Sequence, residues 1–352
     1  MSWLSRSLSS RRRQGVLLVA VAATLAAPAL APAEAASPPG FRQVNLVSDV
    51  PGLARLTDVR VSNPWGIAIG PTTAVWINNN NTATSEAYSG ANGVDPLTLR
   101  IAVQTPAQPT GIAFNPTGAF AAHQNGASVG TLFLFNGFDG YTSGWGPTAV
   151  PVTSAVTTKF SRDNGYLGMA VATTPDGPRL YAVSVTGRIE VLNGRFQDVS
   201  VSGSFSDPAM TGLAPYNVAV FGDRVYVAWF DPSGGPAGGV SVFRFNGSLV
   251  RTLSTSKRLV APWGMAMAPD SWGGFGGSLL VGNVGDGRIT ALDPMTGAVR
   301  GQLKDSTGQP LHNDGLWGLT FGNGVTGTPN DLLFTAGIDH YAHGLFGLIR
   351  PN

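Results

Sequence analysis

The stretch 63–71, NPWGIAIGP, decides the fold, because a close copy, APWGMAMAP, follows at 261–269. Four further copies are QPTGIAFNP (108–116), GYLGMAVAT (165–173), APYNVAVFG (214–222) and GLWGLTFGN (315–323). The fourth residues of the six copies are Gly66, Gly111, Gly168, Asn217, Gly264 and Gly318. They are 45, 57, 49, 47 and 54 residues apart, and self-similarity at about this period is typical of β-propeller blades.

Each copy is followed by further strand-like runs. The second runs are AVWINNN (74–80), AFAAHQN (119–125), RLYAVSV (179–185), RVYVAWF (224–230), SLLVGNV (278–284) and DLLFTAG (331–337). Third runs such as GRIEVLNG (187–194) come next, and Gly, Asn, Asp and Pro separate the runs as they do between strands joined by tight turns. Each unit therefore predicts a small antiparallel sheet, with small residues where the first strands converge on a central axis.

The two ends of this repeat predict how the ring closes. FRQVNLVS (41–48) precedes the first copy, whereas the last unit ends at GLFGLIR (344–350) after three strands. Pairing these two segments would supply the missing outer strand and hide exposed sheet edges. The sequence therefore predicts an all-β fold, a six-bladed β-propeller closed by its N-terminal strand.

Residues 1–36 have the pattern of a secretory signal peptide. Four arginines precede the apolar stretch VLLVAVAATLAAPAL, and APAEAAS offers a cleavage pattern after it. We therefore expect an exported, secreted protein, with the Sec route favoured over the twin-arginine route, and a single domain over 37–352. The apolar stretch is short for a membrane span. The chain has no cysteine, which excludes disulfides and thiolate chemistry.

The charge of the remaining chain argues against two classes of partner. Without residues 1–36, 18 Lys and Arg face 19 Asp and Glu, so the basic character belongs to the leader. The rest has no basic tract, and Gly or Pro breaks its longer apolar runs, which makes nucleic acid and membrane poor partners.

The motif PWGIA followed by VWINN resembles NHL-repeat and gluconolactonase-like six-bladed propellers. Longer phrases, among them VNLVSDVPGLA, LLVGNVGDGRI and FTAGIDHYAHGLFG, resemble a family of secreted, uncharacterised bacterial β-propeller proteins. The gluconolactonase-like resemblance implies one divalent cation on the axis, held by a Glu, Asn and Asp residues, that polarises a lactone carbonyl. Asn63, Asn217, Asn283 and Asp314 match this ligand set in part, but no glutamate joins them. No cofactor is therefore expected, although a divalent cation on the axis stays open.

In propellers of this type the segments entering the first strands and the turns between second and third strands share one face, which we call the top face. Ligands usually bind at such loop-built mouths. The predicted ligand-binding residues are Asn63, Trp65, Tyr216, Asn217, Trp229, Trp263, Asn283 and Trp317. A small molecule, a glycan or a peptide would suit this surface. The tryptophans also recur at one repeat position, which favours packing between blades.

Few residues offer chemistry. The predicted catalytic candidates are Asp339, His340, His343 and Asp314. An imidazole of DHYAH (339–343) could act as a base or metal ligand near pH 7, with an aspartate orienting it. Two hypotheses follow: a binding propeller, which we favour, and a hydrolase or lyase, with or without the help of a metal ion. A hydrogen-bonded loop is the simpler interpretation of DHYAH.

Overall fold

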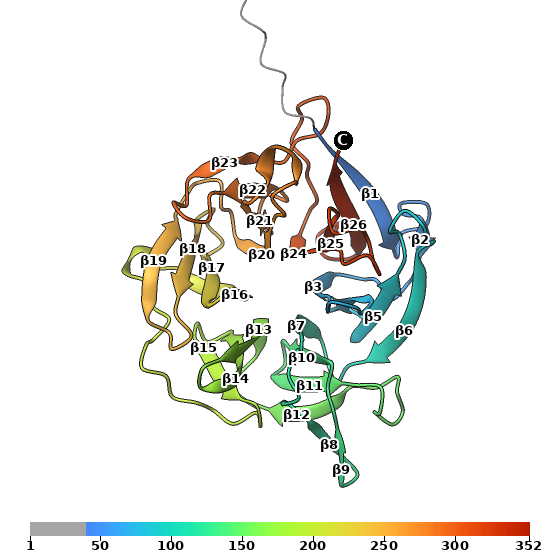
Figure 1. Ribbon diagram of the computed structural model, residues 1–352, viewed down its shortest axis with the longest axis vertical. Helices are drawn as coiled ribbons and strands as arrows, with labels where there is room; N and C mark the ends of the chain where they lie inside the picture. The colour runs from blue at the N-terminus through green and yellow to red at the C-terminus, as the bar shows by residue number, and fades with distance from the viewer. Residues whose placement is uncertain (1–39) are drawn as a thin grey trace, which may run out of the picture. The chain divides into compact units, whose positions relative to one another are not determined.

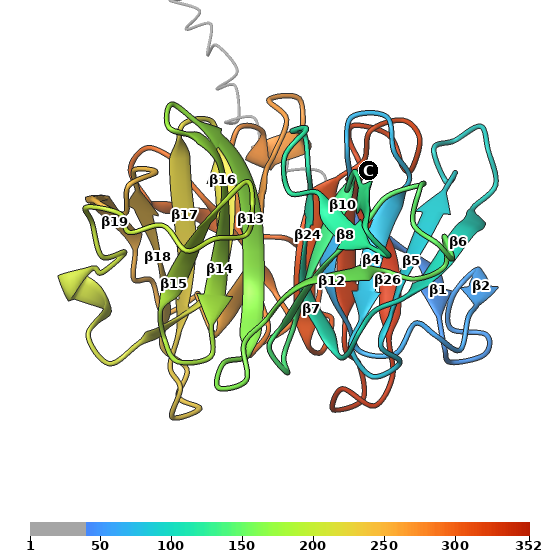
Figure 2. The same ribbon diagram turned by 90° about the horizontal axis from the view of Figure 1, so that it is seen from below.

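Residues 40–352, the part of the chain that the computed structural model describes, form six small antiparallel sheets arranged as a ring (Figure 1). Each sheet is one blade, and its strands run between the two faces of the ring (Figure 2). The only helices in this range are two short 3-10 turns, Pro208–Met210 and Gly273–Phe275. The predicted all-β, six-bladed propeller is confirmed. The predicted signal peptide lies outside the described residues.

The strands of each blade follow one another from the channel outward. The innermost strands are β3 (Pro64–Ala68), β7 (Pro109–Phe114), β13 (Tyr166–Thr174), β16 (Ala214–Phe221), β20 (Pro262–Met267) and β24 (Leu316–Phe321). The second strands are β4 (Val75–Asn79), β10 (Phe133–Gly137), β14 (Gly177–Ser184), β17 (Arg224–Phe230), β21 (Leu279–Asn283) and β25 (Leu332–Ala336). The third strands are β5 (Thr84–Ser89), β11 (Tyr141–Trp145), β15 (Ile189–Asn193), β18 (Gly238–Phe243), β22 (Ile289–Leu292) and β26 (Leu345–Pro351). The outer strands are β6 (Thr98–Gln104), β12 (Val156–Phe160), β19 (Leu249–Ser254), β23 (Val299–Gln302) and, in blade 6, β1 (Phe41–Ser48).

Strand β1 closes the ring, as the sequence predicted. It pairs antiparallel with β26 from Phe41 opposite Pro351 to Ser48 opposite Leu345, with a bulge between Asn45 and Val47. The short strand β2 (Leu56–Thr57) then pairs with β1 in parallel. The last blade is therefore built from both ends of the described chain, which lie side by side in Figure 1.

Blades 2 and 3 differ from the regular pattern. Residues 119–125, predicted as the second strand of blade 2, instead lead into a separate hairpin of β8 (Ala122–Gln124) and β9 (Ala127–Val129). This hairpin projects from the rim in Figure 1, and β10 takes the second position of the blade. Blade 3 has three paired strands. The 119–125 prediction was wrong because a strand-like run does not reveal whether it pairs with its blade or with an inserted hairpin.

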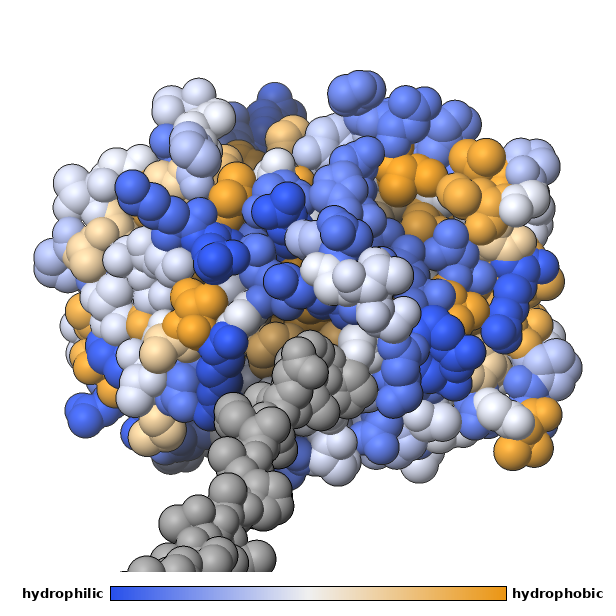
Figure 3. Space-filling view, turned by 90° about the horizontal axis from the view of Figure 1, so that it is seen from above, coloured by the Kyte–Doolittle hydropathy of each residue, from blue (hydrophilic) through white to orange (hydrophobic). Residues whose placement is uncertain are grey.

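Apolar side chains fill the six seams between neighbouring blades. Trp76 of blade 1, for example, stacks on Phe133 of blade 2 with ring centroids 4.8 Å apart. On the side of the ring seen in Figure 3, hydrophobic residues are interspersed with hydrophilic ones. None of the helices in residues 40–352 has the length and apolarity needed to cross a membrane.

Candidate functional site

The repeated glycine lets each innermost strand lie against the next. A Cβ added at Gly66 would stand 2.5 Å from the carbonyl oxygen of Thr110, and one at Gly264 would stand 2.4 Å from that of Trp317. Both carbonyls belong to the residue just before the repeat position of the following blade. Side chains therefore cannot be added at these positions without moving backbone, which explains why the motif is repeated.

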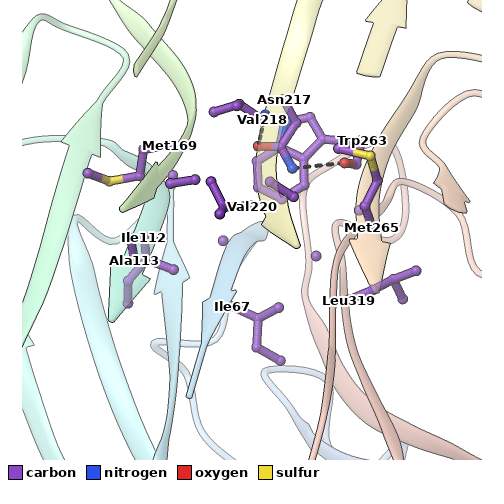
Figure 4. Close-up of a pocket in the computed structure, with 16 residues that line it drawn as sticks. Ile67, Ile112, Ala113, Met169, Asn217, Val218, Val220, Trp263, Met265 and Leu319 are labelled. Atoms are coloured by element: carbon purple, nitrogen blue, oxygen red, sulfur yellow. Dashed lines mark hydrogen bonds between the residues drawn. The ribbon is translucent and has the colours of Figure 1, made fainter. Parts of the chain in front are cut away.

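Asn217 occupies the glycine position in blade 4 and uses its side chain to reach the same place. Its Nδ2 donates to the carbonyl oxygen of Trp263, 2.8 Å away, and its Oδ1 accepts from the Val218 backbone N–H (Figure 4). The side chain lies against Gly168 and is buried. The sequence predicted that this amide would reach the channel and meet a polar group, and it does. Its role in ligand binding stays a prediction.

Below Trp263 the channel holds a cavity of about 180 Å³. Its larger wall residues are Ile67, Ile112, Met169, Val218, Met265 and Leu319 (Figure 4). Asn217 and Trp263 are the lining residues with polar side-chain atoms. Both polar atoms of Asn217 are hydrogen-bonded, whereas the Nε1 of Trp263 is buried without a partner in residues 40–352. Hard cations favour carboxylate ligands, and the residues that line this cavity include no Asp or Glu. Within residues 40–352, no group of three or more His, Asp or Glu residues is placed to hold a metal ion.

An aromatic cluster covers the top mouth of this channel. Trp65 stacks on Trp317 with centroids 3.8 Å apart and planes 17° apart. Trp263 and Tyr216 meet the same ring edge-on, at 5.8 and 5.9 Å. The Nε1 of Trp317 donates to Oδ1 of Asn63 over 3.1 Å, which fixes the indole in its plane. We call Trp65, Tyr216, Trp263 and Trp317 the aromatic cap.

Beside the cap, a pocket of about 310 Å³ opens on the top face between blades 3 and 4. The larger side chains of its wall are Trp65, Phe138, Leu167, Val185, Tyr216 and Phe230. Tyr216 stacks on Phe230 with centroids 4.1 Å apart, and burial raises the pKa of its phenol above the ordinary range. Phe138 is 49% exposed and Val185 45%, so the rim of the pocket is apolar as well.

The wall of this pocket, which we call the aromatic pocket, has few polar groups. Ser184 contributes a hydroxyl, but that hydroxyl is already shared with Asn164 and Thr186. None of the lining residues carries a formal charge. Within residues 40–352 the Nε1 of Trp65 is buried without a hydrogen-bond partner, and the rest of the wall is mostly rings and aliphatic groups. Such a wall favours a largely apolar surface on the ligand.

The structure separates the predicted ligand-binding residues into three groups. Trp65 and Tyr216 line the aromatic pocket, while Trp263, Trp317 and Asn63 are buried in or under the cap. Trp229, predicted to face the ligand, is 6% exposed. It packs in the seam between blades 3 and 4, because side chains alternate between the two faces of β17. Asn283, also predicted there, is buried and donates to the Arg258 carbonyl oxygen and to Asp286.

The predicted catalytic residues do not converge. Nδ1 of His343 lies 2.9 Å from Asp49, whose hydrogen bond raises the pKa of the imidazole. His312, and not His340 or His343, lies beside Asp314, at 3.3 Å. Asp339 and His340 are exposed on the loop after β25. The convergence expected of His340 or His343 with Asp314 is therefore not found, and their catalytic roles stay untested.

The sequence reasoning missed four of the larger side chains in the wall: Phe138, Leu167, Val185 and Phe230. Phe138, Val185 and Phe230 lie at or beside turns between second and third strands, and Leu167 directly precedes the repeated glycine of blade 3. Phe230 ends β17 at the top face, and strand alternation along RVYVAWF would have selected Trp229 for the blade 3 side instead, so the local pattern did not point to Phe230.

The chain is therefore a six-bladed β-propeller with an apolar pocket on its top face. No family model matches the chain. It is 33% identical over 328 residues to Uncharacterized protein R648 of Acanthamoeba polyphaga mimivirus, covering 86% of this chain and 78% of that protein. Uncharacterized protein L690 of the same virus is 31% identical over 328 residues, covering 86% and 83%. The chain belongs to the family of R648 and L690.

Solved structures align with the chain at low sequence identity. A chain of the nidogen/laminin complex aligns with a TM-score of 0.46 at 12% identity, over 75% of this chain and 82% of that one. Saccharomyces cerevisiae Sqt1 aligns with a TM-score of 0.48 at 12% identity, over 84% and 83%. A relation to bacterial secreted propellers or to NHL and gluconolactonase-like proteins stays a prediction.

Proposed function

We propose that this protein is a binding propeller whose aromatic pocket takes a compact ligand, or a peptide side chain, that presents an apolar ring. The observation that carries the proposal is the pocket of about 310 Å³ walled by Trp65, Tyr216 and Phe230 with no charged lining residue. Burial of apolar area stabilises such a complex by roughly 25 cal/mol per Å² before the costs of association.

The chemistry of the wall separates the three ligand types that the sequence left open. Sugar hydroxyls need hydrogen-bond partners, since an unpaired buried polar group costs about 1–3 kcal/mol. The Ser184 hydroxyl already has partners in Asn164 and Thr186, and the Nε1 of Trp65 is a buried donor without a partner in residues 40–352. One indole N–H cannot pair the several hydroxyls of a sugar. The proposal therefore favours a ring-bearing small molecule or a peptide over a glycan. Export by the predicted signal peptide would place this binding outside the cytoplasm, and that location is part of the proposal.

Saturation-transfer NMR with indole and benzyl alcohol as probes tests the proposal. Val185→Trp would fill the rim of the pocket. Val250→Trp adds the same ring on the outer strand β19, at a residue that is 39% exposed and does not line the pocket. We expect probe signals with the unmodified protein and Val250→Trp, and their loss in Val185→Trp. Equal signals from all three proteins would contradict the proposal.

A further inference from the structure

The seam between blades 6 and 1 contains a carboxyl group that the proposed function does not use. Glu86 of β5 is fully buried and lies opposite Ile77 of β4. Tyr88, two residues further along the strand, packs against Phe346 of β26 with centroids 5.9 Å apart. Opposite residues and alternate residues share one face of a sheet. Glu86 therefore faces blade 6, among apolar side chains.

This carboxyl group is poorly compensated. Its Oε1 is 3.8 Å from Nε of Arg60, beyond hydrogen-bond distance. Arg60 is committed elsewhere: its Nε and Nη2 donate to Asp58 over 2.9 and 2.7 Å. The Tyr88 hydroxyl also donates to Asp58, over 2.9 Å. Within residues 40–352 neither oxygen of Glu86 has a hydrogen-bond partner by distance and angle. The nearby Thr84 hydroxyl offsets part of the effect of burial on the pKa of Glu86, but burial dominates.

Burial raises the pKa of Glu86 to about 8, so the group carries a proton at neutral pH. The charged and titratable groups that face it are Asp58 and Arg60 from the segment after β2 and Tyr88 from its own strand. The side of blade 6 that packs against it contributes apolar residues, among them Phe346 and Leu348. The pair formed by Asp58 and Arg60 is nearly neutral as a unit, so it does little to stabilise an ionised Glu86.

Hydrogen bonds near Glu86 hold together the two blades at which the ring closes. Residues 49–63 connect the closing strand β1 to the first innermost strand β3. This connection is tied to β1 where the Asp58 N–H donates to the Ser48 carbonyl oxygen over 2.9 Å. It is tied to blade 1 where the Thr82 hydroxyl donates to the Arg60 carbonyl oxygen over 2.8 Å. Glu86 thus lies beneath the segment that joins the two ends of the ring.

We propose that ring closure in this propeller is linked to a proton: the neutral Glu86 carboxyl keeps the seam between blades 6 and 1 closed, and loss of its proton loosens that seam. An ionised carboxylate without a partner is costly in an apolar seam and is relieved when water enters. The other buried carboxyl groups of residues 40–352, Asp207 and Asp331, both accept hydrogen bonds, so opening would begin at Glu86.

The sign of the pH dependence follows from the two pKa values. The folded state holds the proton more tightly than the unfolded state, whose Glu has the ordinary pKa near 4.5. The stabilisation of the folded state by the Glu86 proton is therefore complete below about pH 4.5 and is lost as the pH rises to about 8. Between these values one proton separates the two states, so the unfolding constant rises about tenfold per pH unit.

The test is urea unfolding at pH 5.5, 6.5 and 7.5 of the full chain, Glu86→Gln and Glu190→Gln. Glutamine keeps the shape of Glu86 without its titration, and Glu190 is a partly exposed glutamate of blade 3 that accepts from Tyr166. We expect the unfolding constant of the unmodified protein, relative to Glu86→Gln, to rise about tenfold per pH unit, and Glu190→Gln to follow the unmodified protein. Parallel curves for Glu86→Gln and the unmodified protein would overturn the proposal.

Hydrogen exchange of the unmodified protein shows which part of the ring opens as the pH rises. It also tests the proposal if Glu86→Gln does not fold. After correction for the intrinsic exchange rate, peptides covering 41–48 and 84–104 should lose about tenfold protection per pH unit between pH 6 and 8. Peptides covering 214–230 in blade 4 should change less. A uniform change around the ring would overturn the proposal.

Discussion

The side-chain Nδ2 of Asn217 lies 2.8 Å from the carbonyl oxygen of Trp263, at the one repeat position where glycine is replaced. In four other blades the glycine backbone itself approaches a carbonyl of the next blade. Asn217 therefore joins blades 4 and 5 by a hydrogen bond where the other pairs are joined by close packing. The bond also supports the backbone beneath the aromatic cap.

Replacing this amide should lower stability modestly. Asn217→Gly removes two buried hydrogen bonds, one to the Trp263 carbonyl oxygen and one from the Val218 N–H, and each contributes about 1 kcal/mol to the free energy of unfolding. Asn217→Asp should cost more, because a carboxylate oxygen would face the Trp263 carbonyl oxygen. Urea unfolding at pH 7 measures both. If Asn217→Asp were as stable as the unmodified protein, the hydrogen bond would not be what joins blades 4 and 5.

The repeated glycines should tolerate no side chain. Gly264→Ala brings a Cβ to 2.4 Å from the Trp317 carbonyl oxygen, and such overpacking costs about 1–3 kcal/mol. Gly118 is the matched control, since its added Cβ would meet nothing within 4 Å. Thermal unfolding should show a clear loss for Gly264→Ala and little change for Gly118→Ala. Equal melting temperatures would mean that close backbone packing does not explain the repeated glycine.

The closing strand should contribute to the stability of the whole ring. Leu46 of β1 is fully buried against blade 1, and Leu→Ala changes at such sites cost about 2–5 kcal/mol. Calorimetry of Leu46→Ala should show one cooperative transition at a lower temperature. A melting temperature indistinguishable from that of the unmodified protein would show that closure by β1 is dispensable.

The imidazole of His343 should report its contact with Asp49. The hydrogen bond raises the pKa of His343, so this contact is complete below about pH 6.5 and weakens as the pH rises through the raised value. An NMR titration of the His343 ring should give a lower pKa in Asp49→Asn than in the unmodified protein. An unchanged pKa would show that Asp49 does not hold this imidazole in solution.

Of two exposed phenylalanines, only the one that lines the aromatic pocket should affect the binding of indole. Phe138 lines the aromatic pocket and is 49% exposed, whereas Phe160 of β12 is 51% exposed and lies outside it. Phe138→Ala should weaken the binding of indole several-fold, because it removes apolar contact area, and Phe160→Ala should leave it unchanged. Saturation-transfer signals compared at equal protein concentration make the measurement. The reverse order of effects would place the binding site outside the aromatic pocket.

The fold was more predictable than the site, for a physical reason. Backbone packing at Gly66 and its equivalents is imposed once per blade, so it leaves a periodic trace in the sequence. Closure of the ring could be predicted because the last unit has three strands and one additional strand precedes the first unit. The inserted hairpin β8–β9 could not, because its strands have the same local composition as a blade strand.

The candidate site depends on side-chain orientations that the local sequence does not determine. Asp339, His340 and Tyr341 all have positive φ, at 51°, 53° and 67°, and this backbone sets where their side chains point. Trp65 and Trp317 share a repeat position, yet one lines the aromatic pocket and the other is buried by their stacking. Which of two equivalent rings is available is decided by packing across the ring of blades.

The central claim is that the aromatic pocket binds a ring-bearing ligand, and fluorine NMR of protein labelled with 5-fluorotryptophan tests it most directly. Trp65 lines the pocket, whereas Trp76 and Trp272 are buried in blade seams and serve as internal references. The Trp65 resonance, assigned through Trp65→Phe, should shift and saturate as indole is added while both references stay fixed. Saturable binding of indole with no change at Trp65 would contradict the claim.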